Sequence, residues 1–162
     1  MTIETIEIGQ PLPKKLHFKA TGGLYTNFDH FKGQWLILYF YPKDATPGCT
    51  TQGCDFRDLE KEFSLFNATI FGVSRDSLIS HEKFKANQGF PFELISDEDE
   101  AFCDLFDVMR VKPMYGKQVR GIERSTFLID PNGVLREAWH KVKVDGHVDD
   151  VFKTLKRLQG SA

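Results

Sequence analysis

Apolar runs alternate along the chain with segments whose apolar residues recur every three or four positions. The run Trp35–Tyr41 is apolar or aromatic throughout, which is typical of a strand buried on both faces. Helical spacing follows it at Phe56, Leu59, Phe63 and Phe66. The pattern predicts a buried strand that leads through a turn into an amphipathic helix.

The rest of the chain continues this alternation of strands and helices. Further strands are expected at Leu16–Ala20, Ala68–Ser74, Phe92–Ile95, Thr126–Ile129 and Val134–Trp139. Helices are expected from Asp76 or Ser77 to about Gln88, from the acidic segment Asp97–Glu100 through Phe106, and over the stripe Val148, Val151, Leu155 and Leu158.

Three segments give weaker patterns. Met1–Gln10 is compatible with a short edge strand or an extended arm, and Leu24–Phe31 is interpreted as a loop. Asp107–Gly121 contains Pro113 and Gly116, two residues that interrupt regular structure, and is also expected to be a loop.

The order of elements predicts an α/β fold. Helices alternate with strands, and a β-hairpin then precedes the last helix, so we expect a central mixed β-sheet flanked by helices on both faces. No internal repeat, low-complexity tract or linker is visible in the 162 residues. The sequence therefore predicts a single domain over residues 1–162.

Composition narrows the classes of function. A formal net charge of −2 gives no electrostatic case for binding nucleic acid or an anionic membrane. No apolar run approaches the ~20 residues of a membrane span, and Met1–Lys19 lacks the pattern of a signal peptide. Three cysteines are too few for a secreted disulfide framework and fit a reducing, cytoplasmic compartment.

The start of the helix after Trp35–Tyr41 carries a candidate reactive thiol. Thr46 suits the N-cap and Pro47 suits the first helical position. Cys49 then falls in the first turn, where free backbone N–H groups and the helix dipole favour the thiolate over the thiol. Cys49 also shares a helix face with Phe56, so we expect it in a partly buried pocket.

A second cysteine, Cys54, lies five residues further on and faces away from the core. In an unbroken helix the two Cα atoms would be roughly 8–9 Å apart, beyond the ~7 Å limit for a disulfide. Either the pair never forms a disulfide, or the start of the helix unwinds. Gly48 and Gly53 are poor helix formers, so we infer a thiol that reacts in the folded helix and a partner that reacts after local unfolding.

The residues around Cys49 resemble a known family. The segment Pro42–Cys49 (PKDATPGC) matches the Pro-x-x-x-Thr-x-x-Cys signature of peroxiredoxins. The longer stretch Tyr41–Cys54, followed by Phe56-Arg57-Asp58, resembles the bacterioferritin comigratory protein group, also called peroxiredoxin Q. The resemblance extends over nearly the whole chain, including Gly72-Val73-Ser74, Leu94-Ile95-Ser96-Asp97 and Arg124-Ser125-Thr126-Phe127-Leu128.

This resemblance implies a thioredoxin-like fold and the reduction of hydrogen peroxide and organic hydroperoxides without a cofactor. Cys49 matches the peroxidatic cysteine, and Cys54 matches the resolving cysteine of members that carry it five residues downstream. Some members place that cysteine on the next helix, near Lys85, where this chain has none. A thioredoxin-type dithiol would reduce the resulting disulfide, and relatives suggest a monomer.

Pro42, Thr46 and Arg124 match the remaining active-site positions of the family. The Thr46 hydroxyl can accept the peroxide proton and donate back, and the N–H groups around Gly48 and Cys49 add donors for the substrate. Arg124 opens a strand that can lie beside Trp35–Tyr41, so its guanidinium could reach Cys49. Pro42 would shield the site from water.

One family position departs from the common pattern, and one cysteine falls outside it. Position 52 is often Glu in relatives and is Gln52 here, where we expect altered hydrogen bonding with little loss of activity. Cys103 lies on a helical apolar pattern and is interpreted as a small core residue.

Three other functions fit parts of the sequence. A thioredoxin-like dithiol reductase would normally carry Cys-x-x-Cys, whereas this chain has Cys-x-x-x-x-Cys. An iron–sulfur pattern would require a cysteine where Arg57 stands, and the scattered histidines lack the spacing of metal ligands, so no metal is expected. A redox-switched binding protein could use the same helix unwinding. Measured peroxide turnover would reduce binding to a secondary role.

Overall fold

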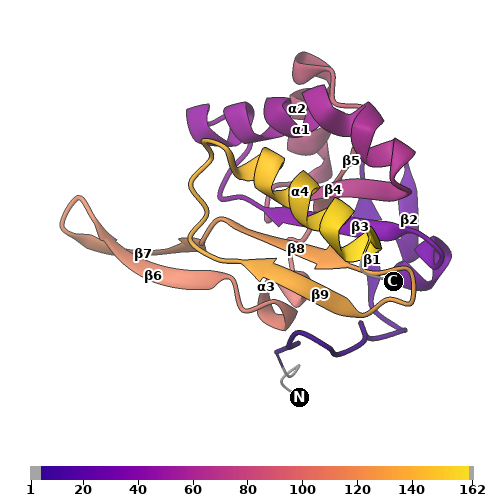
Figure 1. The fold of residues 1–162 in the computed structure, drawn as a ribbon. Helices are drawn as coiled ribbons and strands as arrows, with labels where there is room; N and C mark the ends of the chain where they lie inside the picture. Colours follow the sequence, from indigo (N-terminus) through magenta and orange to yellow (C-terminus); the bar gives the residue numbers. More distant parts are fainter. Residues whose placement is uncertain (1–4, 161–162) are drawn as a thin grey trace.

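The computed structural model describes residues 5–160, and it builds them around one seven-stranded sheet (Figure 1). The strands are β1 (His17–Ala20), β2 (Leu24–Asn27), β3 (Trp35–Phe40), β4 (Ala68–Ser74), β5 (Glu93–Ser96), β6 (Met109–Met114), β7 (Lys117–Ile122), β8 (Ser125–Ile129) and β9 (Leu135–Trp139). The helices are α1 (Pro47–Leu65), α2 (Leu78–Gln88), α3 (Ala101–Leu105) and α4 (His147–Gly160), with a 3₁₀ helix η1 at Phe28–Phe31.

The main sheet is mixed, as the sequence predicts. Its strand order is β2-β1-β5-β4-β3-β8-β9. The three strands β3, β4 and β5 run parallel, and β8 pairs with β3 in the antiparallel sense. β3 is an inner strand between β4 and β8, and all six of its residues are buried.

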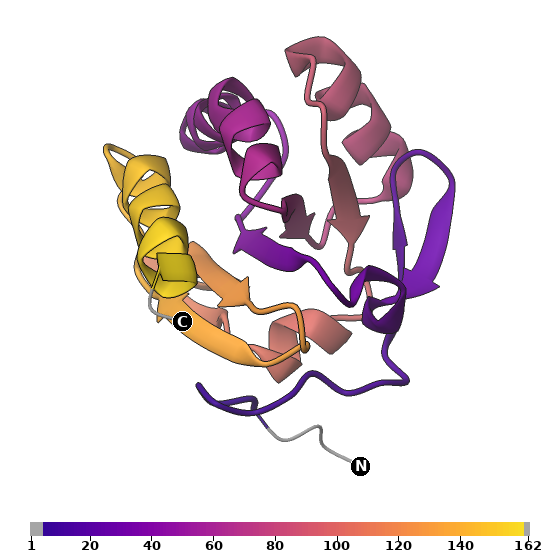
Figure 2. The ribbon, with the colours of Figure 1, turned by 45° about the vertical axis from the view of Figure 1, so that its right-hand side comes forward.

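Helices flank both faces of the sheet, which confirms the predicted layers (Figures 1 and 2). Side chains alternate along β3, so Leu38 and Phe40 pack in one cluster with Phe102 and Phe106 of the α3 region. The opposite cluster joins β3 to α1, α2 and α4, and it contains Ile37, Tyr39, Cys49, Phe56, Phe63, Phe84, Val151 and Leu155. Cys49 therefore lies on the inner face of α1, as its spacing from Phe56 predicts.

The expectation of a loop over Asp107–Gly121 is wrong. These residues form most of the β6–β7 hairpin, which pairs Met109 with Ile122 at its base and projects from the body (Figure 1). Tyr115 and Gly116 make the turn with φ values of 54° and 76°. Gly116 is thus a hairpin turn residue, and Pro113 is tolerated because the sheet has only two strands.

Two further boundaries differ from the sequence prediction. Leu24–Phe31, expected as a loop, contains β2 and η1. The helix expected from Asp97 begins only at Ala101. The Asp97 carboxylate instead accepts hydrogen bonds from the N–H groups of Phe102 and Cys103 at 3.0 and 2.8 Å, so the acidic segment caps the helix from outside.

The N-terminal segment is an arm without a strand over its described part, residues 5–10, and it turns at Ile8 and Gly9. Residues 1–4 of the segment Met1–Gln10 lie outside the described residues. The Ile6 N–H donates to the Leu105 carbonyl at 2.9 Å, and the Gly9 N–H donates to the Leu135 carbonyl at 2.8 Å. None of the helices described is long and apolar enough to cross a membrane.

His147 at the start of α4 makes stability depend on pH. Its Nε2 lies 2.7 Å from the Thr126 hydroxyl, and burial lowers the pKa of His147 from 6.5 to about 4. The unfolded chain binds this proton more readily, so the folded protein loses stability as pH falls from 6.5 towards 4.

We expect wild type to lose about 2–3 kcal/mol more than His147→Gln between pH 7.5 and 4.5. Urea unfolding of both proteins at the two pH values measures this. Burial raises the pKa of Asp97 to about 6, which acts in the opposite direction but equally in both proteins. Parallel pH dependences would contradict the assignment.

Candidate active site

The start of α1 and the start of β8 come together at the carboxyl end of β3. Phe40 pairs with Ser125, which places the preceding residue, Arg124, beside the first turn of α1. The Arg124 Nη2 lies 3.5 Å from the Cys49 Sγ, and Nη1 donates to the Gln52 Oε1 at 2.5 Å. The contact between Arg124 and Cys49, inferred from strand adjacency, is thus present in the structure.

The Arg124 guanidinium is the charged group beside Cys49. The Cys49 side chain is buried, with 2% of its surface exposed, and the Arg124 Nη2 lies 3.5 Å from its sulfur. The second partner of Arg124 is the neutral amide of Gln52, which leaves the guanidinium charge uncancelled. A glutamate at position 52 would compete with the sulfur for that charge.

Two buried polar atoms at this site have no hydrogen-bond partner among the described residues. They are the Tyr39 hydroxyl and the Gln52 Nε2. Burial, followed by the nearby Cys49, raises the pKa of Tyr39 well above its ordinary value, so the phenol remains protonated. Unsatisfied buried donors are rare in folded proteins, and the Gln52 amide is one whose other end is bonded to Arg124 beside Cys49.

The expected site residues Thr46 and Gly48 lie at the N-terminus of α1. Thr46 is the N-cap by position, but its hydroxyl donates to the Lys43 carbonyl at 2.9 Å and makes no capping bond to the helix. The predicted N-cap position is confirmed, although Thr46 lacks the side-chain bond that usually accompanies it. A Cβ on Gly48 would lie 3.1 Å from Arg124 Nη2, so glycine here lets the guanidinium approach the helix.

Pro42 is exposed on the loop between β3 and α1. It lines a polar hollow with Lys43, Arg75, Asp76, Glu98 and Glu100. The lining of this hollow does not include Cys49, and the expected role of Pro42 as a shield remains a prediction.

Cys54 is half-buried on the second turn of α1, where it contacts the end of α2. Its Sγ lies 3.5 Å from the Gln88 Oε1, and Arg57 donates to the Gln88 carbonyl at 2.7 Å. Helix α1 is continuous over both cysteines, and the three cysteines are free thiols in the described residues. The structure is that of the dithiol form with the helix intact.

Close packing of α1 against the aromatic residues after α2 depends on Gly53. A Cβ at Gly53 would lie 2.4 Å from the Phe90 ring, and Phe84 and Phe92 back that ring at centroid distances of 5.0 Å. We expect Gly53→Ala to lower the free energy of unfolding by about 2 kcal/mol, because overpacking of about 3 kcal/mol exceeds the helix preference of alanine, about 1 kcal/mol.

Thermal or urea unfolding tests this expectation, with Gly121→Ala on β7 as the matched control. A Cβ at Gly121 meets nothing within 4 Å among the described residues. If Gly53→Ala were as stable as Gly121→Ala, the packing argument would fail.

Cys103 differs from Cys49 in its surroundings. It is fully buried, and burial together with the nearby Asp97 carboxylate raises the pKa of the Cys103 thiol. A thiol held protonated in the core is a poor nucleophile, which supports its interpretation as a core residue.

Sequence analysis missed a buried polar cluster beside the site. Asp44, Asp76 and His81 bring one ligand atom each within 4.8 Å of one another, although His81 has no ligand spacing in the sequence. Asp44 belongs to the segment that resembles peroxiredoxins, and this was the only signal pointing to it.

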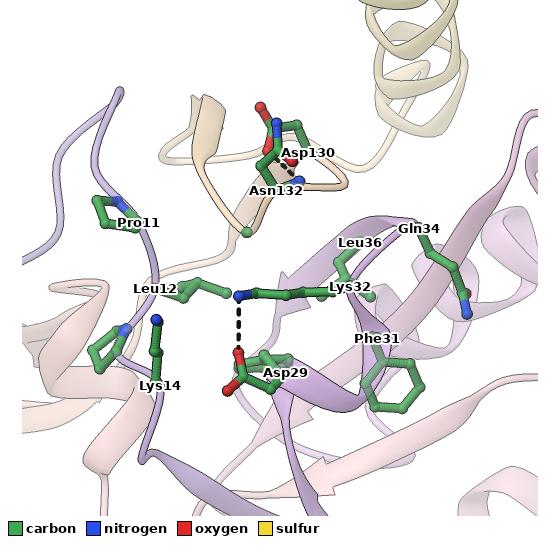
Figure 3. Close-up of a pocket in the computed structure, with 13 residues that line it drawn as sticks. Pro11, Leu12, Lys14, Asp29, Phe31, Lys32, Gln34, Leu36, Asp130 and Asn132 are labelled. Atoms are coloured by element: carbon green, nitrogen blue, oxygen red, sulfur yellow. Dashed lines mark hydrogen bonds and ion pairs between the residues drawn. The ribbon is translucent and has the colours of Figure 1, made fainter.

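A separate apolar pocket lies at the opposite end of β3. Figure 3 shows Leu12 of the N-terminal arm, Phe31 of η1 and Leu36 of β3 around it, together with Lys32 and Asp29, which form an ion pair of 3.4 Å. This pocket adjoins the amino end of β3, whereas Cys49 follows the carboxyl end.

Comparisons with known proteins identify the class. The sequence profile of the AhpC/TSA family matches residues 8–138, and the chain belongs to this family. It is 57% identical over 141 residues to peroxiredoxin Bcp of Xanthomonas campestris, covering 87% of this chain and 88% of that protein. It is 49% identical over 154 residues to peroxiredoxin Bcp of Bacillus subtilis, covering 95% and 98%.

Solved structures agree with this assignment. The bacterioferritin comigratory protein of Xanthomonas campestris, described with an alkyl peroxide reduction activity, superimposes with a TM-score of 0.86 at 52% identity, over 95% of this chain and 98% of that one. A cysteine-to-serine mutant of PrxQ from Xylella fastidiosa gives a TM-score of 0.91 at 45% identity, over 96% and 99%. The predicted thioredoxin-like fold is confirmed, and the chain is a thiol-dependent peroxidase.

Proposed function

We propose that Cys49 is the peroxidatic cysteine of this peroxidase and that Cys54 resolves it. The observation that carries the assignment is the contact of 3.5 Å between the Arg124 guanidinium and the buried Cys49 sulfur at the N-terminus of α1. Cys49 combines a guanidinium 3.5 Å from its sulfur with a place in the first turn of α1, a combination that favours a nucleophilic sulfur.

In the first step the Cys49 thiolate attacks one peroxide oxygen. The sulfur gains that oxygen, the O–O bond breaks, and the other oxygen leaves as water or an alcohol after taking up a proton. Arg124 and the first N–H groups of α1, near Gly48 and Cys49, face the developing negative charge. The Thr46 hydroxyl oxygen accepts a hydrogen bond from the O–H of the bound peroxide, while its own hydrogen stays on the Lys43 carbonyl.

In the second step the Cys54 thiol attacks the sulfenic acid and expels water, forming an intramolecular disulfide. The intact α1 holds the two Cα atoms about 8–9 Å apart, too far for that bond. The first turns of α1 must therefore unwind, which breaks the contacts of Cys54 and Arg57 with Gln88.

With the start of α1 unwound, the disulfide becomes accessible to an external dithiol, for which a thioredoxin-type protein is our candidate. Hydrogen peroxide and organic hydroperoxides are the proposed substrates, and the cycle needs no cofactor. We propose that the protein acts as a monomer, as the resemblance to the family suggests. We place it in the cytoplasm, because three cysteines without a disulfide framework suit a reducing compartment.

Peroxide-dependent oxidation of NADPH, coupled through thioredoxin and its reductase, tests this cycle. We expect sustained turnover by wild type, whereas Cys54→Ser consumes peroxide once and loses turnover with thioredoxin. Turnover by Cys54→Ser equal to that of wild type would exclude Cys54 as the resolving residue. Absence of NADPH oxidation in wild type with every dithiol tried would exclude the proposed reductant class.

A further inference from the structure

The loop between β3 and α1 is held by a buried hydrogen-bonded pair. Asp44 lies on this loop, and His81 lies on α2 with none of its surface exposed. The His81 Nδ1 is 2.7 Å from Asp44 Oδ2, and Nε2 is 2.9 Å from the Ile95 carbonyl oxygen. A carbonyl can only accept, so Nε2 donates to Ile95, and this orients the ring with Nδ1 towards Asp44.

Further donors fix the Asp44 carboxylate. The Tyr41 hydroxyl donates to Oδ1 at 2.6 Å, and the Ser80 hydroxyl donates to Oδ2 at 2.7 Å. The backbone is held too, because the Asp44 N–H donates to Asp76 Oδ2 at 2.9 Å. Asp44 is thereby bound at the same time to the residue that follows β3, to α2 and to the loop that follows β4. We call the hydrogen bonds of Asp44 with His81, Tyr41, Ser80 and Asp76 the Asp44 clamp.

The loop is strained at the residue that follows this clamp. Ala45 has a φ of 63°, a left-handed conformation that is unfavourable for alanine and persists only when neighbouring contacts enforce it. The next residue is Thr46, the N-cap of α1, and Cys49 lies three residues further on. The contacts of Asp44 therefore set the direction in which the helix and its thiol enter the site.

The same cluster has the residue types of a metal site, but its atoms are already paired. Asp44 Oδ2 accepts from the Ser80 hydroxyl and contacts His81 Nδ1, and Asp76 Oδ2 accepts from the Ser74 hydroxyl at 2.6 Å. A cation would have to displace these donors and break the contact between Nδ1 and Asp44. The arrangement favours a hydrogen-bonded clamp over a metal site.

We propose that His81 is a positioning residue for peroxide reduction, acting through Asp44 to hold Thr46 and the first turn of α1 in reactive geometry. This inference rests on the proposed role of Cys49. Loss of the clamp should slow the attack of Cys49 on peroxide without slowing the later formation of the disulfide, because that step requires α1 to unwind.

Stopped-flow measurement of sulfenic acid formation and of disulfide formation, each with hydrogen peroxide, separates the two steps. We expect His81→Phe to slow the first step by about 10–100-fold, since displacements near 1 Å can cost that much. Ser80→Ala, a milder change, should slow it about threefold or more. Neither variant should slow disulfide formation.

Ser77→Ala is the matched control, because the Ser77 hydroxyl caps α2 by accepting from the Ser80 N–H at 3.2 Å without contacting Asp44. It should cost about 1 kcal/mol of stability in urea unfolding while leaving the first step at the wild-type rate.

Three results would overturn the proposal. The first is that folded His81→Phe, or Ser80→Ala, forms the sulfenic acid at the wild-type rate. The second is that Ser77→Ala slows this step as much as the other two variants do. The third is that EDTA lowers the wild-type rate and Mn²⁺ or Zn²⁺ restores it, which would establish a metal site. A wild type whose Cys49 fails to react with peroxide would refute the proposed function itself and the role of His81 with it.

Discussion

Replacing Cys49 by serine should reduce peroxide turnover by about 10³-fold or more, the scale seen when a catalytic nucleophile is removed. The serine hydroxyl remains protonated at neutral pH, so Arg124 cannot stabilise an anion there. Serine is close in size to cysteine, and α1 should keep its fold. Steady-state peroxide consumption with an excess of dithiothreitol measures the effect.

Cys103→Ala is the control for this prediction. Cys103 is fully buried among α3 residues, so its truncation should lower stability by about 1–2 kcal/mol while turnover stays near that of wild type. Substantial turnover by Cys49→Ser, or its loss in folded Cys103→Ala, would show that the reactive thiol has been assigned to the wrong residue.

Removing the charge of Arg124 should have the second-largest effect. Arg124→Met should lower the second-order rate constant for oxidation of Cys49 by about 10²–10³-fold, because it removes both the cation beside the sulfur and a donor to the leaving oxygen. Arg124→Lys should retain part of the rate, since it keeps the charge but cannot bond Gln52 and Cys49 together. Stopped-flow or competition kinetics with hydrogen peroxide gives these constants.

Arg136 on β9 provides a matched arginine away from the site. It pairs with Asp130 at 3.3 Å and is partly exposed, so Arg136→Met should leave the rate constant unchanged. If Arg124→Met reacted within twofold of wild type, the guanidinium would not be part of the chemistry.

The site could be predicted from sequence where local rules and strand adjacency act together. The apolar run Trp35–Tyr41 and the Thr46-Pro47 helix start locate Cys49, and the pairing of β8 with β3 brings Arg124 to it. The hydroxyl of Thr46 shows the limit of such rules, because it bonds Lys43 although a threonine at that position usually caps the helix.

The contact between His81 and Asp44 and the β6–β7 hairpin could not be predicted, because they depend on tertiary contacts that leave no local sequence pattern. His81 and Asp44 are 37 residues apart and meet only because α2 packs beside the loop after β3. The hairpin over Met109–Ile122 was missed because Pro113 and Gly116 are loop formers in most contexts. Tyr115 and Gly116 adopt the left-handed backbone conformation and form a tight turn between the two paired strands.

The central claim is that Cys49 attacks peroxide and Cys54 resolves the product. Intact mass and free-thiol count, before and after one equivalent of hydrogen peroxide, test it most directly on wild type and Cys54→Ser. Wild type should lose two of its three thiols with no added oxygen, and Cys54→Ser should gain a single oxygen at Cys49. Three surviving thiols in wild type, or oxidation at Cys103 in place of Cys49, would contradict the account.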